Sequence, residues 1–190
     1  MKIAVYGSAA DASHEIKKKA REIGREIARH GHILVTGGCG GYPYEAVLGA
    51  REIDGRCIAY SPAPDLERHV RDHGFPTEGF SDFVFVPKDY EHIENPHVCR
   101  KYRNVSSVAA SDACIFIGGR IGTMNEFTIA YDCGKRIGIL ENSGGISDNL
   151  ISELIRTAGK ESRAIIYDPN PVSLVDKLTG LENVILTSRS

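Results

Sequence analysis

The chain has 190 residues, of which 42% are hydrophobic and 25% are charged. This is the composition of an ordinary globular protein, so the sequence predicts a single domain spanning residues 1–190 and excludes a disordered chain. The 23 basic and 25 acidic side chains give a net charge of −2, from which we expect no general affinity for nucleic acid or for an anionic membrane.

The apolar runs are short, and the cysteines show no pairing pattern. The longest runs have five or six residues, such as Ala113 to Ile117, whereas a membrane-spanning helix needs about 20. No signal peptide is expected. The five cysteines include no CxxC pair, which argues against a zinc site or disulfides and favours a reduced, cytoplasmic protein.

Strand-like and helix-like segments alternate along the chain. Strands are expected at residues 2–6, 33–36, 57–60, 82–86, 113–117, 136–140 and 164–167. Helices are expected at residues 14–30, 44–53, 66–73, 96–110, 124–133, about 150–155 and 171–178. The strands are continuous apolar runs, which is typical of strands covered on both faces. The sequence therefore predicts a doubly wound, Rossmann-like α/β fold, with about seven mostly parallel strands and helices on both faces.

Local signals mark the ends of two of these helices. Gly31 follows the first helix in the C′ position, where glycine commonly ends a helix. Asn95 and Pro96 are typical of an N-cap and of the first helical position, so they predict the start of the fourth helix.

Glycine is concentrated just after three predicted strands. The candidate ligand-binding residues there are Gly7, Ser8, Gly37, Gly38, Gly40, Gly41, Gly118, Gly119, Arg120, Gly122 and Thr123. Ligands of parallel α/β sheets bind beyond the carboxyl ends of the strands. Glycine lets the backbone turn tightly and approach a ligand, and the following helix presents free N–H groups. Two glycine clusters on one sheet edge therefore favour a phosphate-bearing small molecule over glycines that only make short turns.

Several known chemical signatures are absent from the chain. The segment GGCGGY does not match GxGxxG, and neither GxxxxGK[ST] nor GxSxG occurs. Nicotinamide cofactors and P-loop chemistry are therefore disfavoured, and no cofactor is expected. The histidines are scattered and none is expected to pair with a cysteine or carboxylate at metal-ligand spacing, so no metal site is predicted.

Thr123 and Glu126 support two compatible interpretations. Thr-x-x-Glu at the start of a helix is a capping box, in which each side chain satisfies a backbone N–H. The functional interpretation makes Thr123 a phosphate ligand and Glu126 a carboxylate that faces the ligand. Both can hold, because a cap at this sheet edge lies where the ligand would bind.

The predicted helix before the fifth strand carries several cations. Arg100 and Lys101 fit a solvated basic face as well as a ligand site. Arg103 adjoins the apolar stripe that includes Tyr102 and Val105, so we expect it to be partly buried. A buried arginine there is suited to bind a carboxylate or phosphate in fork geometry.

The segment RNVSSVAASDACIFIGGRIGTMNE resembles the signature of the Lonely Guy (LOG) family, long mislabelled as lysine decarboxylases. The family motif PGGxGTxxE is matched at Gly119, Gly122, Thr123 and Glu126. Residues 111–113 match the preceding Ser-Asp-Ala step, and Arg103 falls on the family arginine. The turn TGGCGGYPYEAVLGA is similar to the family's GGxxGxMxA turn, and Gly7 and Ser8 match its N-terminal step.

Three positions depart from the family pattern. Gly118 replaces the motif proline, Arg120 replaces its second glycine, and Asn104 replaces the family lysine. Arg120 either adds a cation to the phosphate site or crowds the pocket.

The resemblance implies a nucleoside 5′-monophosphate phosphoribohydrolase, which splits the N-glycosidic bond into a free base and ribose 5-phosphate. It implies that Glu126 is the catalytic carboxylate beside an oxocarbenium-like transition state, and that Arg103 is the catalytic cation that positions the substrate. The 5′-phosphate would bind the N–H groups of residues 119–123, while Ser8 and residues 37–41 would line the base and ribose.

Other functions remain open alongside this one. The same superfamily contains proteins that bind nucleotide-type or molybdopterin-type ligands without hydrolysing them, and Arg120 and Asn104 favour that alternative. Lysine decarboxylation is rejected, because no lysine follows the strands that bear the glycine clusters and could form a Schiff base. The resemblance also implies a homodimer or a higher homo-oligomer.

Overall fold

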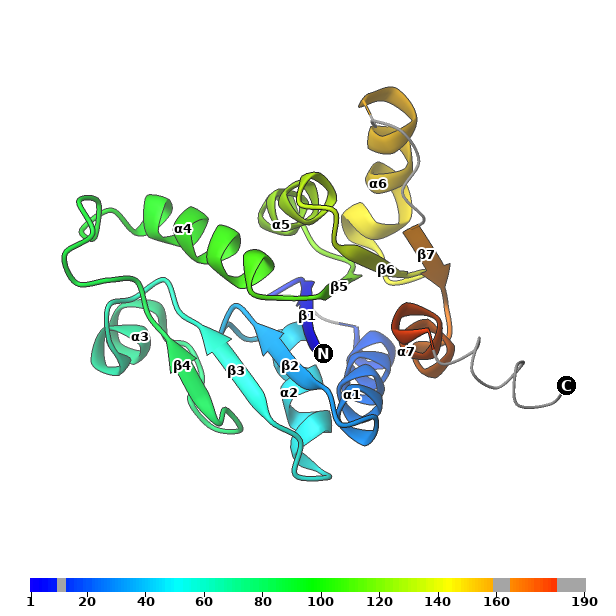
Figure 1. Ribbon diagram of the computed structural model, residues 1–190, viewed down its shortest axis with the longest axis horizontal. Helices are drawn as coiled ribbons and strands as arrows, with labels where there is room; N and C mark the ends of the chain where they lie inside the picture. The colour runs from blue at the N-terminus through cyan, green and yellow to red at the C-terminus, as the bar shows by residue number, and fades with distance from the viewer. Residues whose placement is uncertain (10–12, 159–164, 181–190) are drawn as a thin grey trace, which may run out of the picture.

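The computed structural model describes residues 1–9, 13–158 and 165–180, and within them seven parallel strands alternate with seven helices (Figure 1). The strands are β1 (Lys2–Gly7), β2 (Ile33–Thr36), β3 (Cys57–Tyr60), β4 (Asp82–Val84), β5 (Ala113–Ile117), β6 (Arg136–Leu140) and β7 (Ile165–Asp168). The helices are α1 (His14–Arg29), α2 (Tyr42–Arg51), α3 (Leu66–His73), α4 (Pro96–Ala109), α5 (Ile121–Asp132), α6 (Gly145–Ala158) and α7 (Pro171–Thr179). The predicted α/β class and the number of strands are confirmed.

The strand order across the sheet is β4-β3-β2-β1-β5-β6-β7. The chain adds strands on one side of β1 up to β4, then crosses back and continues from β5 on the other side. In register, Gly7 of β1 pairs with Ile117 of β5. The order therefore reverses between β1 and β5, and in such sheets the crevice beyond this reversal is where ligands bind.

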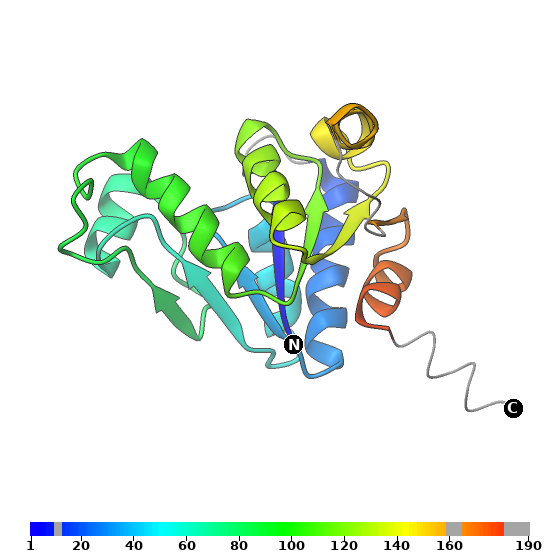
Figure 2. The same ribbon diagram turned by 45° about the horizontal axis from the view of Figure 1, so that its top comes forward.

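Two hydrophobic cores cover the two faces of the sheet. Successive side chains of β1 point to opposite faces, as in any strand. Ile3 and Val5 pack with α1, α2 and α7, whereas Ala4 and Tyr6 pack with α4, α5 and α6. The two helix layers lie on either side of the sheet in Figure 1, and in Figure 2 α4 and α5 lie in front of it. This arrangement confirms helices on both faces.

The end signals of two helices work as the sequence predicts. The Asn95 side chain caps α4 by accepting hydrogen bonds from the backbone N–H groups of His97 and Val98, at 3.1 and 3.3 Å. Gly31, which follows α1, has a φ of 70°, a left-handed value that favours glycine.

The start of α5 differs from the prediction. The helix begins at Ile121 rather than at residue 124, and Arg120 takes the N-cap position without a side-chain cap hydrogen bond. The cause is the preceding turn, because Gly118 and Gly119 have φ values of 57° and 93° and bring the chain into the helix early. Thr123 is therefore the third helical residue, and the capping box is wrong.

The start of α2 also differs from the prediction. Helix α2 begins at Tyr42, two residues before the predicted start, with Pro43 in its first turn. The predicted first residue of the seventh strand, Ala164, lies outside the described residues. Among the described residues, no helix combines the length and the apolar composition needed to cross a bilayer.

Candidate functional site

A cleft of about 510 Å³, here called the main cleft, lies beyond the carboxyl end of β1. Its floor and walls come from the turns after β1 and β2 and from helices α4 and α5. The lining residues are Gly7, Ser8, Ala9, Cys39, Phe75, Arg100, Lys101, Arg103, Asn104, Arg120, Ile121, Gly122, Thr123 and Glu126. The main cleft thus occupies the reversal point of the strand order.

Arg103 and Glu126 meet in the main cleft. Arg103 Nη1 lies 4.0 Å from Glu126 Oε1, and the two residues are only 9% and 7% exposed. Arg103 comes from α4 and Glu126 from the second turn of α5, so the pair joins two helices that follow one another along the chain. The predicted burial of Arg103 is confirmed, and the structure brings together the two residues that the sequence nominated as catalytic.

The placement of Arg103 depends on the glycine after β2. A Cβ added at Gly37 would lie 1.3 Å from Arg103 Nη1, so any larger residue would occupy the space of the guanidinium. Helix α4 is held to the sheet below by Tyr6, whose hydroxyl donates to Ser107 Oγ at 2.8 Å. The tyrosine is fully buried, and burial raises its pKa well above the usual value.

Glu126 exchanges its proton near neutrality. Burial raises its pKa to about 7, against the opposing effects of Arg103 and then Lys101. A carboxyl group of this kind is present in both protonation states near pH 7, which suits either acid–base chemistry or the stabilisation of positive charge.

Two buried polar atoms beside this pair lack partners within the described residues. They are Arg103 Nε and Asn104 Oδ1. The Asn104 amide nitrogen is engaged, since it donates to Asn125 Oδ1 at 2.8 Å. Buried polar atoms in native proteins are nearly always hydrogen-bonded, so a donor and an acceptor that stay free at a cleft indicate a ligand site.

A second cavity of about 340 Å³, here called the glycine hollow, adjoins the main cleft. Ser8 and Arg120 line both cavities. The glycine hollow is completed by Ser13, Tyr42, Gly119, Ser143, Gly144 and Gly145. It lies over the turn between β5 and α5, where the first N–H groups of α5 have no partner within the helix.

The predicted binding residues divide into two groups. Those that line the main cleft are Gly7, Ser8, Arg103, Arg120, Gly122, Thr123 and Glu126, and Gly119 lines the glycine hollow. Those that line neither cavity are Gly37, Gly38, Gly40, Gly41 and Gly118.

Three of the four predicted glycines after β2 have a structural role within the turn. Gly37 makes room for Arg103, and the Gly38 N–H donates to Thr36 Oγ1 at 3.1 Å. Gly41 has a φ of 75°, and a Cβ there would lie 2.1 Å from the Ser8 carbonyl oxygen. In the same way the Gly118 N–H is occupied, since it donates to Ser143 Oγ at 2.8 Å.

Two contributors to these cavities were not predicted from the sequence. Residues 143–145, Ser-Gly-Gly, follow β6 and contact the turn after β5, where the Ile146 N–H donates to the Gly119 carbonyl at 3.1 Å. The glycine pair at residues 144–145, just after a predicted strand, was the signal that could have found them. Phe75 comes from the proline-punctuated segment between β3 and β4, and no local pattern marks it as a cleft residue.

The expectation that no histidine pairs with a carboxylate at metal-ligand spacing is wrong at His30. Its Nε2 lies 2.9 Å from Glu26 Oε1 and 3.1 Å from Asp176 Oδ1, which joins α1 to α7. The spacing of Glu26 and His30, one helical turn apart, was readable from the sequence. Arg29 Nη1 also lies 2.6 Å from Glu26 Oε2, so an ion-pair network accounts for the cluster.

The chain resembles solved structures over nearly its whole length. The molybdenum cofactor binding protein of the phototrophic bacterium Rippkaea orientalis matches with a TM-score of 0.73 and 21% identity, over 95% of this chain and 96% of that one. DNA processing protein A of Helicobacter pylori matches with a TM-score of 0.67 and 20% identity, over 95% of this chain and 80% of that one. At such identities the likeness shows the fold alone.

The expectation of no nucleic-acid binding is overturned. DNA processing protein A of Helicobacter pylori, which has this fold, binds single-stranded DNA. The net charge does not settle the question, because it averages the whole surface, whereas basic side chains outnumber acidic ones in the lining of the main cleft. Its lining includes one carboxylate, Glu126, and four cations, namely Arg100, Lys101, Arg103 and Arg120.

The kinship inferred from the sequence motifs is confirmed at the superfamily level. An uncharacterized protein of Archaeoglobus fulgidus is 33% identical over 142 residues, which are 74% of this chain and 80% of that protein. The family model of the SLOG cluster4 family matches residues 1–175, which include every residue of the main cleft and the glycine hollow. The chain therefore belongs to the SLOG cluster4 family, within the LOG/SLOG superfamily of Rossmann-like proteins.

Proposed function

We propose that the protein hydrolyses the N-glycosidic bond of a nucleoside 5′-monophosphate and releases the free base and ribose 5-phosphate. The observation that carries this proposal is the buried pair of Arg103 and Glu126, 4.0 Å apart in a cleft beside the first turn of a helix. The pair supplies a carboxyl group that titrates near neutrality and a cation held next to it.

The phosphate of the substrate would bind at the start of α5. Helix N-termini attract anions, because their first N–H groups are free and the helix dipole is positive there. Thr123 lies in this first turn, is 4% exposed and lines the main cleft, and Arg120 adds a positive charge beside it. Phosphate at this end directs the ribose toward Glu126, one helical turn further along α5.

The chemistry assigned to Glu126 is the stabilisation of positive charge on the ribose. When the bond between C1′ and the base breaks, the bonding electrons leave with the base and the ribose becomes oxocarbenium-like. An ionised carboxylate stabilises this charge, and water then adds at C1′ and gives up a proton that balances the one taken by the base. Arg103 keeps the carboxylate and the substrate in position and stabilises negative charge on the leaving base.

The test is base release from a panel of nucleoside 5′-monophosphates, followed by chromatography. We expect the wild-type protein to produce base and ribose 5-phosphate and the Glu126→Gln variant, which keeps the shape but not the charge, to produce neither. The control is Lys18→Ala, which removes an exposed cation of α1 that does not line the main cleft. Equal base release by wild type and Glu126→Gln refutes the catalytic role.

A second function, binding without hydrolysis, is supported by Arg120. This arginine replaces a glycine of the family motif and lines both the main cleft and the glycine hollow, where it favours retention of an anionic ligand. A protein of the same fold from Rippkaea orientalis binds the molybdenum cofactor. Intact nucleotides after long incubation, together with measurable binding of one of them, would favour this carrier function.

A further inference from the structure

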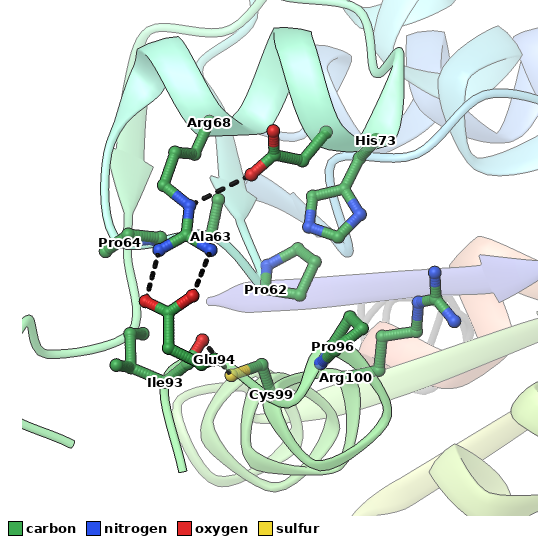
Figure 3. Close-up of a pocket in the computed structure, with 11 residues that line it drawn as sticks. Pro62, Ala63, Pro64, Arg68, His73, Ile93, Glu94, Pro96, Cys99 and Arg100 are labelled. Atoms are coloured by element: carbon green, nitrogen blue, oxygen red, sulfur yellow. Dashed lines mark hydrogen bonds and ion pairs between the residues drawn. The ribbon is translucent and has the colours of Figure 1, made fainter. Parts of the chain in front are cut away.

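A third cavity, here called the α3–α4 hollow, lies between α3 and α4 and has a volume of about 290 Å³ (Figure 3). Arg100 lines both this hollow and the main cleft. His73 lines the hollow and stacks on Phe75, which lines the main cleft, with ring centroids 5.2 Å apart. The two cavities are therefore neighbours that share a wall.

Most charged side chains in the α3–α4 hollow pair with one another. Arg68 donates to Asp72 at 2.9 Å and, in fork geometry, to the two oxygens of Glu94 at 3.0 and 3.2 Å, as the dashed lines in Figure 3 show. The other walls are largely apolar and include Pro62 and Pro96. In this part of the hollow the charged side chains, one cation and two carboxylates, are held by bonds to one another.

Arg100 is different. It makes no hydrogen bond or ion pair with any described residue, and Figure 3 shows its guanidinium at the same end of the hollow as His73. Outside the cavities, each described arginine has a carboxylate or carbonyl partner; these are Arg21, Arg25, Arg29, Arg51, Arg56, Arg71, Arg136 and Arg156. Among the described arginines, those without a partner are Arg100 and Arg120, and both line the main cleft.

The three cavities lie in sequence along one edge of the sheet. The glycine hollow contains Ser143, which follows β6; the main cleft contains Ser8 and Cys39, which follow β1 and β2; and the α3–α4 hollow contains Pro62, which follows β3. This order matches the order of the strands, so Arg120 and Arg100 stand toward opposite ends of the main cleft.

We propose that the ligand carries anionic groups at two ends, one bound beside Arg120 and the other bound by Arg100, with the group that bears the second anion seated in the α3–α4 hollow. This inference rests on the proposed phosphate site at α5. The ligand class is a nucleotide with a second anionic substituent, either a carboxylate on the base or a second phosphate. Arginine binds both groups in the same two-pronged geometry, so the structure favours their shared chemistry.

The test is isothermal titration calorimetry in the Glu126→Gln background, in which no ligand is consumed. Three probes are compared: AMP with one anionic end, adenylosuccinate with carboxylates on the base, and adenosine 3′,5′-bisphosphate with a second phosphate. We expect one two-ended probe to bind about 10-fold more tightly than AMP, and its identity distinguishes the two sources of the anion.

Two variants and a control locate the effect. Arg100→Ala is expected to abolish the gain and leave the AMP affinity within about twofold. Ile93→Trp, which fills part of the α3–α4 hollow, is expected to weaken the two-ended probe only. Lys18→Ala removes an exposed cation of α1 that lines none of the three cavities, and it should change none of the affinities. Circular dichroism and the midpoint of thermal unfolding verify that each variant is folded.

Three outcomes overturn the inference. They are equal affinity for all three probes, equal weakening of all three by Arg100→Ala, and tighter, strongly salt-dependent binding of oligothymidylate, which would assign the cations to a nucleic-acid backbone. The base-release assay separates this inference from the proposed function. Hydrolysis without an affinity gain refutes only the two-ended ligand, and an affinity gain without hydrolysis refutes only the reaction.

Discussion

At the scale of single residues, the site depends on one buried ion pair and on the space made for it. Arg103 and Glu126 are both withdrawn from solvent, and Gly37 leaves room for the guanidinium. Burial destabilises the ionised form of Glu126 more than the nearby charge of Arg103 stabilises it. The pKa of Glu126 is therefore raised to about 7. The burial of this pair therefore sets the protonation behaviour of the cleft carboxyl group.

The raised pKa makes stability depend on pH. The folded protein holds the Glu126 proton more tightly than the unfolded chain, in which the pKa of this carboxyl group has its usual value of 4.5. The contribution of Glu126 to stability therefore falls as the pH rises from about 4.5 to about 7. Glu126→Gln removes this titration. We therefore compare the unfolding free energy of the variant with that of the wild type by urea unfolding. The difference, variant minus wild type, should increase by about 3 kcal/mol between pH 4 and pH 8. Parallel pH curves for the two proteins would contradict the raised pKa.

Gly37→Ala tests the space reserved for Arg103. Its Cβ would displace Nη1, so we expect base release and nucleotide affinity to fall at least about 10-fold. The matched control is Gly40→Ala in the same turn, where the nearest atom to the new Cβ is the Ala9 carbonyl oxygen at 3.9 Å. Similar losses in both variants would show that the turn, and not the arginine, responds to the added methyl group.

At the scale of elements, α4 is the helix that connects the cavities. It presents Arg103 to the main cleft and Arg100 to the boundary with the α3–α4 hollow. Its start is fixed by the Asn95 cap, and its middle is tied to β1 through Tyr6 and Ser107. A change in where this helix begins would therefore displace Arg100 and Arg103 together.

Asn95→Ala and Asn170→Ala form a matched pair of cap removals. Each asparagine accepts hydrogen bonds from two backbone N–H groups at the start of a helix, Asn95 on α4 and Asn170 on α7. Each substitution should lower the unfolding free energy by about 1 kcal/mol in urea. Only Asn95→Ala should also weaken AMP binding in calorimetry, because α4 carries residues of the main cleft and α7 carries none. Equal effects on binding would mean that stability alone controls affinity.

At the scale of the whole molecule, the layers are set by how closely the helices approach one another. A Cβ at Gly24 of α1 would lie 1.8 Å from the Ala46 carbonyl oxygen of α2, and a Cβ at Gly49 of α2 would lie 1.8 Å from the Arg21 carbonyl oxygen of α1. The two helices therefore touch backbone to backbone on one face of the sheet.

Gly24→Ala distinguishes packing from helix propensity by the sign of its effect. Propensity alone predicts a gain of about 1 kcal/mol, because alanine favours a helix over glycine. The close approach of α1 and α2 predicts instead a loss of about 2 kcal/mol, since the helices must separate to admit the methyl group. Urea unfolding decides between the two, and an increase in stability would contradict the observed contact.

The sequence alone determined the order and type of the elements. Apolar periodicity and local turn residues are short-range signals, so strands such as 113–117 and the cap at Asn95 were readable without the fold. Arg103 and Glu126 were also found as candidates from the sequence. Arg103 adjoins an apolar helical stripe, and Glu126 belongs to the motif that follows the strand at 113–117. The start of α5 was misjudged, because the positive φ of Gly118 and Gly119 is not encoded by a periodic pattern.

Only the tertiary structure decided what depends on contacts between distant residues. It showed that Gly37 makes room for Arg103, that residues 143–145 complete the glycine hollow, and that Arg100 lines two cavities. The raised pKa of Glu126 likewise arises from burial, which no local pattern reports. Periodicity describes each element by itself, whereas desolvation, close approach and cavity shape arise only when the strand order brings those elements together.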